Sequence, residues 1–132
     1  MQAYREASGP RFGEIWMCHL NQDGSVQGGY RPVFIASNNL NNTHSTTLNV
    51  IPITSKMNKR KLPVHVELWD PNKFGLKEPS TMMVEQFTTI PASRLDRCVG
   101  KIDDTATIGE IRDAMTVQFP IFQMSTGEKL QA

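Results

Sequence analysis

The chain is dominated by short segments rich in strand-forming residues, and turn residues separate each segment from the next. At least six such segments precede residue 103: residues 13–20, 31–37, 46–54, 64–68, 80–87 and 97–102. No helical pattern long enough for a crossover connection lies between them, and parallel strands require such connections. The pattern therefore predicts antiparallel strands that form a small barrel, not an α/β sheet.

The pattern changes after residue 103, where one amphipathic helix is expected. Asp104 is a suitable N-cap residue, and four apolar residues recur after it at helical spacing. These residues are Ile108, Ile111, Met115 and Phe119. Pro120 ends the pattern because proline cannot continue an α-helix. The expected fold class is mainly β with a C-terminal helix whose apolar side packs on the barrel.

The remaining segments are interpreted as connections. The polar stretches 38–45 and 70–79 are predicted to be loops, because residues typical of turns are frequent in both. Cys18 and Cys98 each lie in a strand-like segment, so both are expected to be buried thiols without a disulfide.

One domain is the default for a chain of 132 residues. Residues 1–12 are expected to form a flexible N-terminal extension, residues 13–122 the folded domain, and residues 123–132 a polar tail. The start of the chain has no apolar stretch typical of a signal peptide, and no apolar run approaches the roughly 18 residues of a membrane span. These features predict a cytoplasmic protein without membrane contact.

The charge balance argues against whole-molecule attraction to nucleic acid. Lys and Arg number 14 against 13 Asp and Glu, which gives a net charge of +1. Any affinity for RNA must therefore come from a local patch. The basic turn that contains Lys56, Lys59, Arg60 and Lys61 is one candidate, although a solvated turn is the other interpretation of the same residues.

Three segments contain the residue types that RNA cleavage requires: residues 27–35 (QGGYRPVFI), 51–56 (IPITSK) and 62–68 (LPVHVEL). The ribose 2′-hydroxyl beside each phosphate can attack phosphorus itself, so neither a metal nor an organic cofactor is needed. The protein has to move protons to and from the ribose oxygens and to stabilise the phosphate charge. An Arg beside a Ser or Thr hydroxyl meets the second requirement, because both donate hydrogen bonds to phosphate oxygens.

The motif G-G-x-R-P at residues 28–32, followed by a Thr at the end of the next strand, resembles the MazF/PemK family of toxin endoribonucleases. The similarity runs from G-E-I-W at Gly13 through V-E-Q-F at Val84 to the helix near Met115. It implies an SH3-like barrel of the MazF/PemK/CcdB type that forms a homodimer. It also implies cleavage of single-stranded RNA at short sequences and neutralisation by a cognate antitoxin.

The resemblance implies roles for individual residues. Arg31 is the expected catalytic arginine, and Thr54 is the expected hydroxyl that stabilises the phosphate. The expected substrate-binding residues are Gln27, Gly28, Gly29, Ser55, Lys56, Leu62, His65 and Gln86. The expected products carry a 2′,3′-cyclic phosphate and a 5′-hydroxyl. Val26 stands where many relatives carry an acidic residue, so the preferred RNA sequence is not predicted.

Two other functions fit the same fold. One is a toxin that poisons a protein target such as DNA gyrase, and the other is a catalytically inactive module that binds RNA or an antitoxin. His65 and Glu67 also have a structural interpretation as members of a cross-strand ion pair. A zinc site built from His19, His44 and Cys18 is not expected, because adjacent strand residues point to opposite faces and a fourth ligand is not evident.

Overall fold

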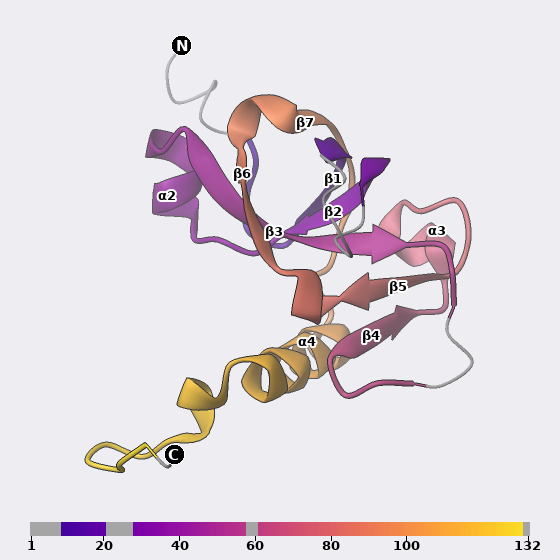
Figure 1. The fold of residues 1–132 in the computed structure, drawn as a ribbon. Coiled ribbons are helices and arrows are strands. Elements are labelled where there is room, and N and C mark those ends of the chain that lie inside the picture. The colour runs from indigo at the N-terminus through magenta and orange to yellow at the C-terminus, as the bar shows by residue number, and fades with distance from the viewer. Residues whose placement is uncertain (1–8, 21–27, 58–60, 131–132) are drawn as a thin grey trace.

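The computed structural model describes residues 9–20, 28–57 and 61–130, and these contain seven strands and three α-helices (Figure 1). The strands are β1 (Glu14–Leu20), β2 (Gly29–Ile35), β3 (Thr47–Thr54), β4 (His65–Leu68), β5 (Ser80–Met83), β6 (Thr88–Pro91) and β7 (Leu95–Lys101). The helices are α2 (Asn39–His44), α3 (Pro71–Phe74) and α4 (Thr105–Gln118), with 3-10 turns η1 (Val84–Gln86), η2 (Ala92–Arg94) and η3 (Pro120–Gln123). The predicted class, mainly β with a C-terminal helix, is confirmed.

The strands form one antiparallel sheet in the order β4-β5-β3-β2-β1-β7, and β6 also pairs with β3. The first half of β3 pairs with β6, whereas its last two residues pair with β5. Within the described residues β6 and β7 are joined by η2 and share no ladder, so the predicted small barrel is not fully closed. The strands β1, β2, β3, β6 and β7 form a ring (Figure 1). Between β6 and β7 the ring is joined by the η2 turn and not by strand pairing.

Two apolar clusters lie on opposite faces of the central strands. The first contains Ile15, Phe34, Ile51, Ile53, Val66, Leu68, Phe74, Met82, Val84, Ile102, Ile111 and Ala114. The second contains Cys18, Leu20, Val33, Ile35, Leu48, Val50 and Ile90. Successive residues of β2 alternate between the clusters, as the period of a β-strand requires. Helix α4 covers the first cluster beside β4 and β5 (Figure 1).

Helix α4 begins and packs as its sequence predicts. The Asp104 carboxylate accepts hydrogen bonds from the backbone N–H and the hydroxyl of Thr107 at 2.9 and 2.7 Å. These bonds lower the pKa of Asp104 to about 2. Ile111 is buried, and the Phe119 ring packs edge-on against Phe87 with centroids 5.4 Å apart. The apolar side of the helix is therefore packed against the sheet.

The segment predicted to be a loop at residues 38–45 is instead helix α2, and this prediction is wrong. Asn38 is its N-cap, and its side chain accepts a hydrogen bond from the backbone N–H of Asn41 at 2.8 Å. Asn42 is buried and bonds to the hydroxyl and the carbonyl of Ser37 at 2.5 and 2.8 Å. Polar side chains stabilise this short helix by satisfying backbone groups, so it has no apolar periodicity to reveal it.

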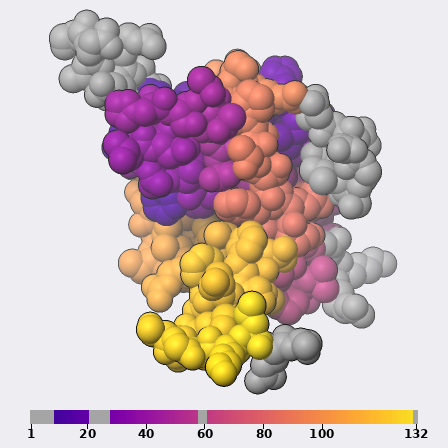
Figure 2. Space-filling model, turned by 60° about the vertical axis from the view of Figure 1, so that its left-hand side comes forward, coloured from indigo at the N-terminus to yellow at the C-terminus, as the bar shows by residue number. Residues whose placement is uncertain are grey.

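Exposed apolar side chains gather where the chain leaves α4. Ile121 and Phe122 in η3 are 68% and 66% exposed. Figure 2 shows this C-terminal segment in yellow at the lower end of the molecule, next to the paler orange residues of α4. None of the helices in the described residues is long and apolar enough to cross a membrane.

A second short helix, α3, was not predicted within the loop at residues 70–79. It ends at Gly75, whose φ of 75° is in the left-handed region. A Cβ on Gly75 would lie 1.9 Å from the carbonyl oxygen of Val99, and a Cβ on Gly100 would lie 2.0 Å from that of Phe74. The two backbones therefore approach so closely that glycine is required on both sides.

This contact predicts opposite effects for two glycine substitutions. Gly100→Ala should lower the free energy of unfolding by about 1–3 kcal/mol, because the new methyl group meets backbone atoms that cannot rotate away. Gly109→Ala, in the middle of α4 with open space around it, should raise it by about 0.5–1 kcal/mol. Guanidinium unfolding of both variants measures the difference. Equal effects of the two substitutions would contradict the close approach of α3 and β7.

The two cysteines differ in exposure, so the prediction that both are buried is wrong for Cys98. Cys18 has no exposed surface, and burial raises its pKa to about 11. Cys98 is exposed on β7. A thiol reagent should therefore modify one cysteine in the folded protein and both in guanidinium, with Cys98 identified by peptide mass. Rapid modification of Cys18 in the folded state would contradict the packing of the second cluster.

Candidate functional site

The pairing of β2 with β3 brings the two predicted catalytic residues to the same end of the sheet. The recorded pairs are Val33 with Pro52, Phe34 with Ile51, and Ile35 with Val50. The ladder ends at Val33 and Pro52, and the same register extended by two residues along both strands would bring Arg31 level with Thr54. Residues directly opposite each other across an antiparallel pair project to the same face, with Cβ atoms about 5 Å apart.

This face of the sheet continues across two further strands. Thr54 pairs with Thr81 of β5, and Thr81 pairs with Glu67 of β4. His65 lies two residues before Glu67 and therefore points to the same side. One row of polar side chains therefore crosses four strands. We call it the polar row, and it consists of Glu67, Thr81, Thr54 and Arg31.

The Arg31 guanidinium is fixed through one of its nitrogens. Its Nε donates a hydrogen bond of 2.7 Å to the carbonyl oxygen of Gly28. Gly29, between them, has a φ of 81° and begins β2, so the backbone turns sharply at the point that positions the acceptor. No acceptor for Nη1 or Nη2 occurs among the described residues. The half-buried guanidinium therefore presents two amino groups to an incoming ligand.

The Thr54 side chain is buried, with 6% of the residue exposed. Its Oγ1 accepts a hydrogen bond of 3.2 Å from the backbone N–H of Lys56, which orients the hydroxyl at the end of β3. Within the described part of the chain this hydroxyl makes no bond in which it is the donor. Its hydrogen is therefore available for an oxygen that approaches the polar row. Ser55 and Lys56 follow directly and are exposed.

His65 is held by a partner that the sequence did not reveal. Its side chain is 5% exposed, and its Nε2 lies 3.0 Å from Oε2 of Glu85 in η1. Glu67, two residues along the same face of β4, lies 4.0 Å from the Lys61 ammonium. Each of the two residues therefore has a partner outside β4, in agreement with their structural interpretation as members of ion pairs.

The other expected substrate-binding residues lie around the same end of the sheet. Leu62 is half-buried just before β4, and its carbonyl oxygen accepts the N–H of His65 at 3.0 Å. Gln86 is half-buried in η1, and its Nε2 contacts the sulfur of Met83 at 3.7 Å. Gln27 lies outside the described residues, as do Lys59 and Arg60 of the basic turn.

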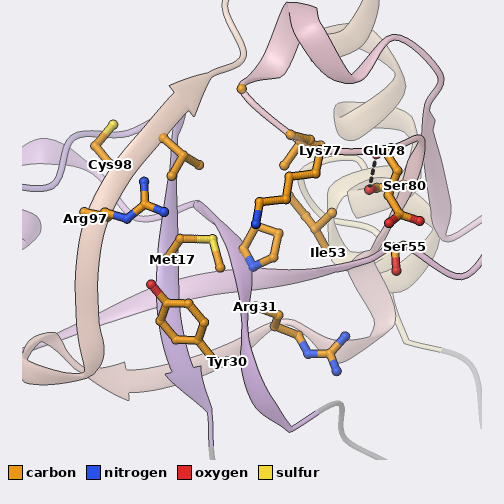
Figure 3. A pocket seen from close by; sticks show the side chains of 14 residues that line it. Met17, Tyr30, Arg31, Ile53, Ser55, Lys77, Glu78, Ser80, Arg97 and Cys98 are labelled. Carbon is orange, nitrogen blue, oxygen red and sulfur yellow. Dashed lines mark hydrogen bonds between the residues drawn. The ribbon is translucent and has the colours of Figure 1, made fainter.

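A cavity of about 660 Å³ adjoins the polar row (Figure 3). It is lined by Met17, Tyr30, Arg31, Pro32, Ile53, Ser55, Gly75, Leu76, Lys77, Glu78, Ser80, Arg97, Cys98 and Val99. Arg31 and Ser55 therefore border both the polar row and this cavity, which we call the Arg31 pocket. Sequence reasoning missed most of it, because its walls come from β1, β2, β3, β7 and the loop after α3.

Tyr30 stands at one side of the Arg31 pocket. Its hydroxyl donates a hydrogen bond of 2.5 Å to the Asp96 carboxylate, and this bond raises the pKa of Tyr30. Its ring lies 4.7 Å from the His19 ring, centroid to centroid. The hydrogen bond and the ring contact together fix an exposed aromatic face beside Arg31. In the described part of the chain, no group of three or more His, Cys, Asp or Glu side chains is placed to hold a metal ion.

The chain is similar to known proteins over most of its length. Residues 11–119 match the family model described as PemK-like, MazF-like toxin of type II toxin-antitoxin system. The chain is 34% identical over 108 residues to "Endoribonuclease MazF" of Staphylococcus saprophyticus, with 81% of this chain and 88% of the relative covered. It is 38% identical over 93 residues to "Endoribonuclease EndoA" of Bacillus subtilis, with 70% and 79% covered.

The fold is also found among solved structures. The "Mycobacterium tuberculosis toxin MazF-mt6" superimposes with a TM-score of 0.68 at 25% sequence identity. The superposition covers 81% of this chain and 96% of that one. The similarity therefore extends over the sheet and the C-terminal helix together.

Proposed function

Because the chain belongs to the PemK-like, MazF-like family of type II toxins, we propose that it is a toxin endoribonuclease that cleaves single-stranded RNA at short specific sequences. The observation that supports this proposal is the β2–β3 register, which brings the strand ends that carry Arg31 and Thr54 to the same end of the sheet. A phosphate between them would receive hydrogen bonds from both side chains.

The reaction is an attack of the ribose 2′-hydroxyl on the neighbouring phosphorus. The 2′-oxygen gives up its proton and bonds to phosphorus, the bond from phosphorus to the 5′-oxygen breaks, and that oxygen takes up a proton. The products carry a 2′,3′-cyclic phosphate and a 5′-hydroxyl. Arg31 Nη1 and Nη2 stabilise the negative charge that grows on the phosphate oxygens, and the Thr54 hydroxyl donates to the same group.

The residues around the polar row supply the remaining substrate contacts. Exposed Ser55 and Lys56 lie beside the phosphate position, and Lys56 adds positive charge for a flanking phosphate. Gln86, Leu62 and His65 form the side of the site toward β4 and η1, where the RNA bases are read. On the other side, Gly28 and Gly29 lead into β2 beside Arg31. We propose Gln27, which lies outside the described residues, as a further substrate contact.

The alternative functions have no support in the relatives. Both curated relatives are named endoribonucleases, and neither a gyrase poison nor an inactive module is needed to explain the polar row. The proposed partners are a cognate antitoxin, since the family consists of toxins of type II toxin-antitoxin systems, and an RNA strand, since the two relatives described above are named endoribonucleases. The active form is a homodimer of the domain at residues 13–122, and it acts in the cytoplasm.

Metal independence is the first test. Long mixed RNA incubated with the protein in excess EDTA should be cleaved, because the 2′-hydroxyl supplies the nucleophile. Sequencing of the fragments that begin with a 5′-hydroxyl identifies the recognised sequence. The 3′ ends of the upstream fragments should resist ligation until their 2′,3′-cyclic phosphate is removed. Cleavage abolished by EDTA, or 5′-phosphate ends, would refute the mechanism.

The catalytic pair is tested with three substitutions. Arg31→Ala should lower kcat/KM by roughly 100-fold, the usual loss when one donor to a developing oxyanion is removed. Thr54→Val should lower it by at least about tenfold at constant volume, and Thr54→Ser should keep most activity because the hydroxyl remains. Arg112→Ala on the exposed side of α4 is the matched control. A normal rate for Arg31→Ala would remove Arg31 from the reaction.

A further inference from the structure

The Arg31 pocket is positively charged although the whole chain is nearly neutral. The charged side chains that line it are Arg31, Lys77, Arg97 and Glu78, which leaves two positive charges in excess. Figure 3 shows the Lys77 ammonium and the Arg97 guanidinium directed into the cavity from different sides. Among the described residues Lys77 has no ion-pair partner. The Arg97 side chain, by contrast, hydrogen-bonds to Tyr30 at the side of the pocket. An excess of positive charge in a concave site attracts an anionic ligand.

The walls of the pocket suit a flat, partly apolar ligand that carries a phosphate. Met17, Ile53 and Leu76 supply apolar surface, and the fixed Tyr30 ring stands beside them. A hydroxyl is available at Ser55, whereas the Ser80 hydroxyl already donates to the carbonyl oxygen of Glu78 at 2.8 Å. The volume of about 660 Å³ lies within the range of sites that enclose small organic ligands. A nucleotide combines these features, with a base for the walls and a phosphate for the cations.

The pocket is continuous with the polar row. Arg31 borders both, and Ser55 lies in the pocket wall directly after Thr54. An RNA strand whose scissile phosphate lies between Arg31 and Thr54 therefore passes the mouth of the pocket with its next residue. We propose that the Arg31 pocket binds a nucleotide that flanks the scissile phosphate, with Lys77 and Arg97 on its phosphate. This assignment rests on the proposed ribonuclease function.

An acidic peptide is the other ligand that would satisfy the cations. RNA is favoured because the pocket opens onto the residues that hold the scissile phosphate, and because its apolar walls and aromatic ring match a base. A peptide carboxylate would use the cations alone. The distinction is measurable, because only a nucleotide subsite depends on the length of the RNA substrate.

The test uses the shortest RNA oligonucleotide that the wild-type protein cleaves at full efficiency. Lys77→Met and Arg97→Met should each raise KM about tenfold, the loss expected for one charge-assisted hydrogen bond, with kcat changed less than about twofold. Each should also reduce the slope of log affinity against log salt by about 0.7, the value for one phosphate contact in a single strand. Lys101→Met removes an equal charge from exposed β7 outside the pocket and should change neither quantity.

Shortening the oligonucleotide one nucleotide at a time locates the occupant. One truncation should raise KM of the wild-type protein about tenfold and leave the pocket variants unaffected, because they have already lost that contact. Pocket variants that behave like Lys101→Met, or that lose only antitoxin binding, would overturn the proposal while leaving the ribonuclease intact. Absence of any RNA cleavage by the wild-type protein would instead refute the proposed function itself.

Discussion

The antiparallel pairing of β2 with β3 is the constraint on which both the core and the site depend. One register aligns Phe34 with Ile51 in the first apolar cluster and Ile35 with Val50 in the second. Because side chains alternate along a strand, a slip of one residue would move each side chain to the opposite face and disrupt the packing of both clusters. Burial of these side chains therefore also fixes the ends of β2 and β3 that carry Arg31 and Thr54. The relative position of the two proposed catalytic residues thus depends on apolar packing several residues away from them.

The second constraint is the close approach of α3 to β7. Gly75 and Gly100 permit backbone contact there, and the loop that follows Gly75 forms one wall of the Arg31 pocket. The opposite wall comes from β7, which carries Arg97, while Lys77 comes from the loop. Charges that lie 20 residues apart in the sequence thereby converge on one cavity. A chain of nearly neutral charge thus acquires a local excess of positive charge from residues that are not clustered in its sequence.

The sequence was most informative where a periodic pattern or a motif was present. Alternating apolar residues predicted the strands, helical spacing predicted α4, and the G-G-x-R-P motif pointed to Arg31. Helix α2 was missed because its stability comes from Asn38 and Asn42 bonding to backbone and hydroxyl groups, which leaves no periodicity. The ion pair of His65 with Glu85 was missed because η1 turns back toward β4 only in three dimensions. Lys77 and Arg97 had no signal, because single cations in loops and edge strands are common on any surface.

Strand geometry also explains how the ends of β2 and β3 contribute side chains both to the polar row and to the Arg31 pocket. Thr54 and Ser55 are consecutive at the end of β3, and consecutive side chains in an extended chain point to opposite faces. Thr54 faces the polar row, and Ser55 faces the Arg31 pocket. Likewise Pro32 lines the pocket while Arg31, beside it, stands at the border of both. In the proposed function, the strand ends therefore separate the hydroxyl that contacts the scissile phosphate from the pocket that holds the flanking nucleotide. An RNA bound to both would cross the edge between them, which a flexible single strand permits more readily than a duplex.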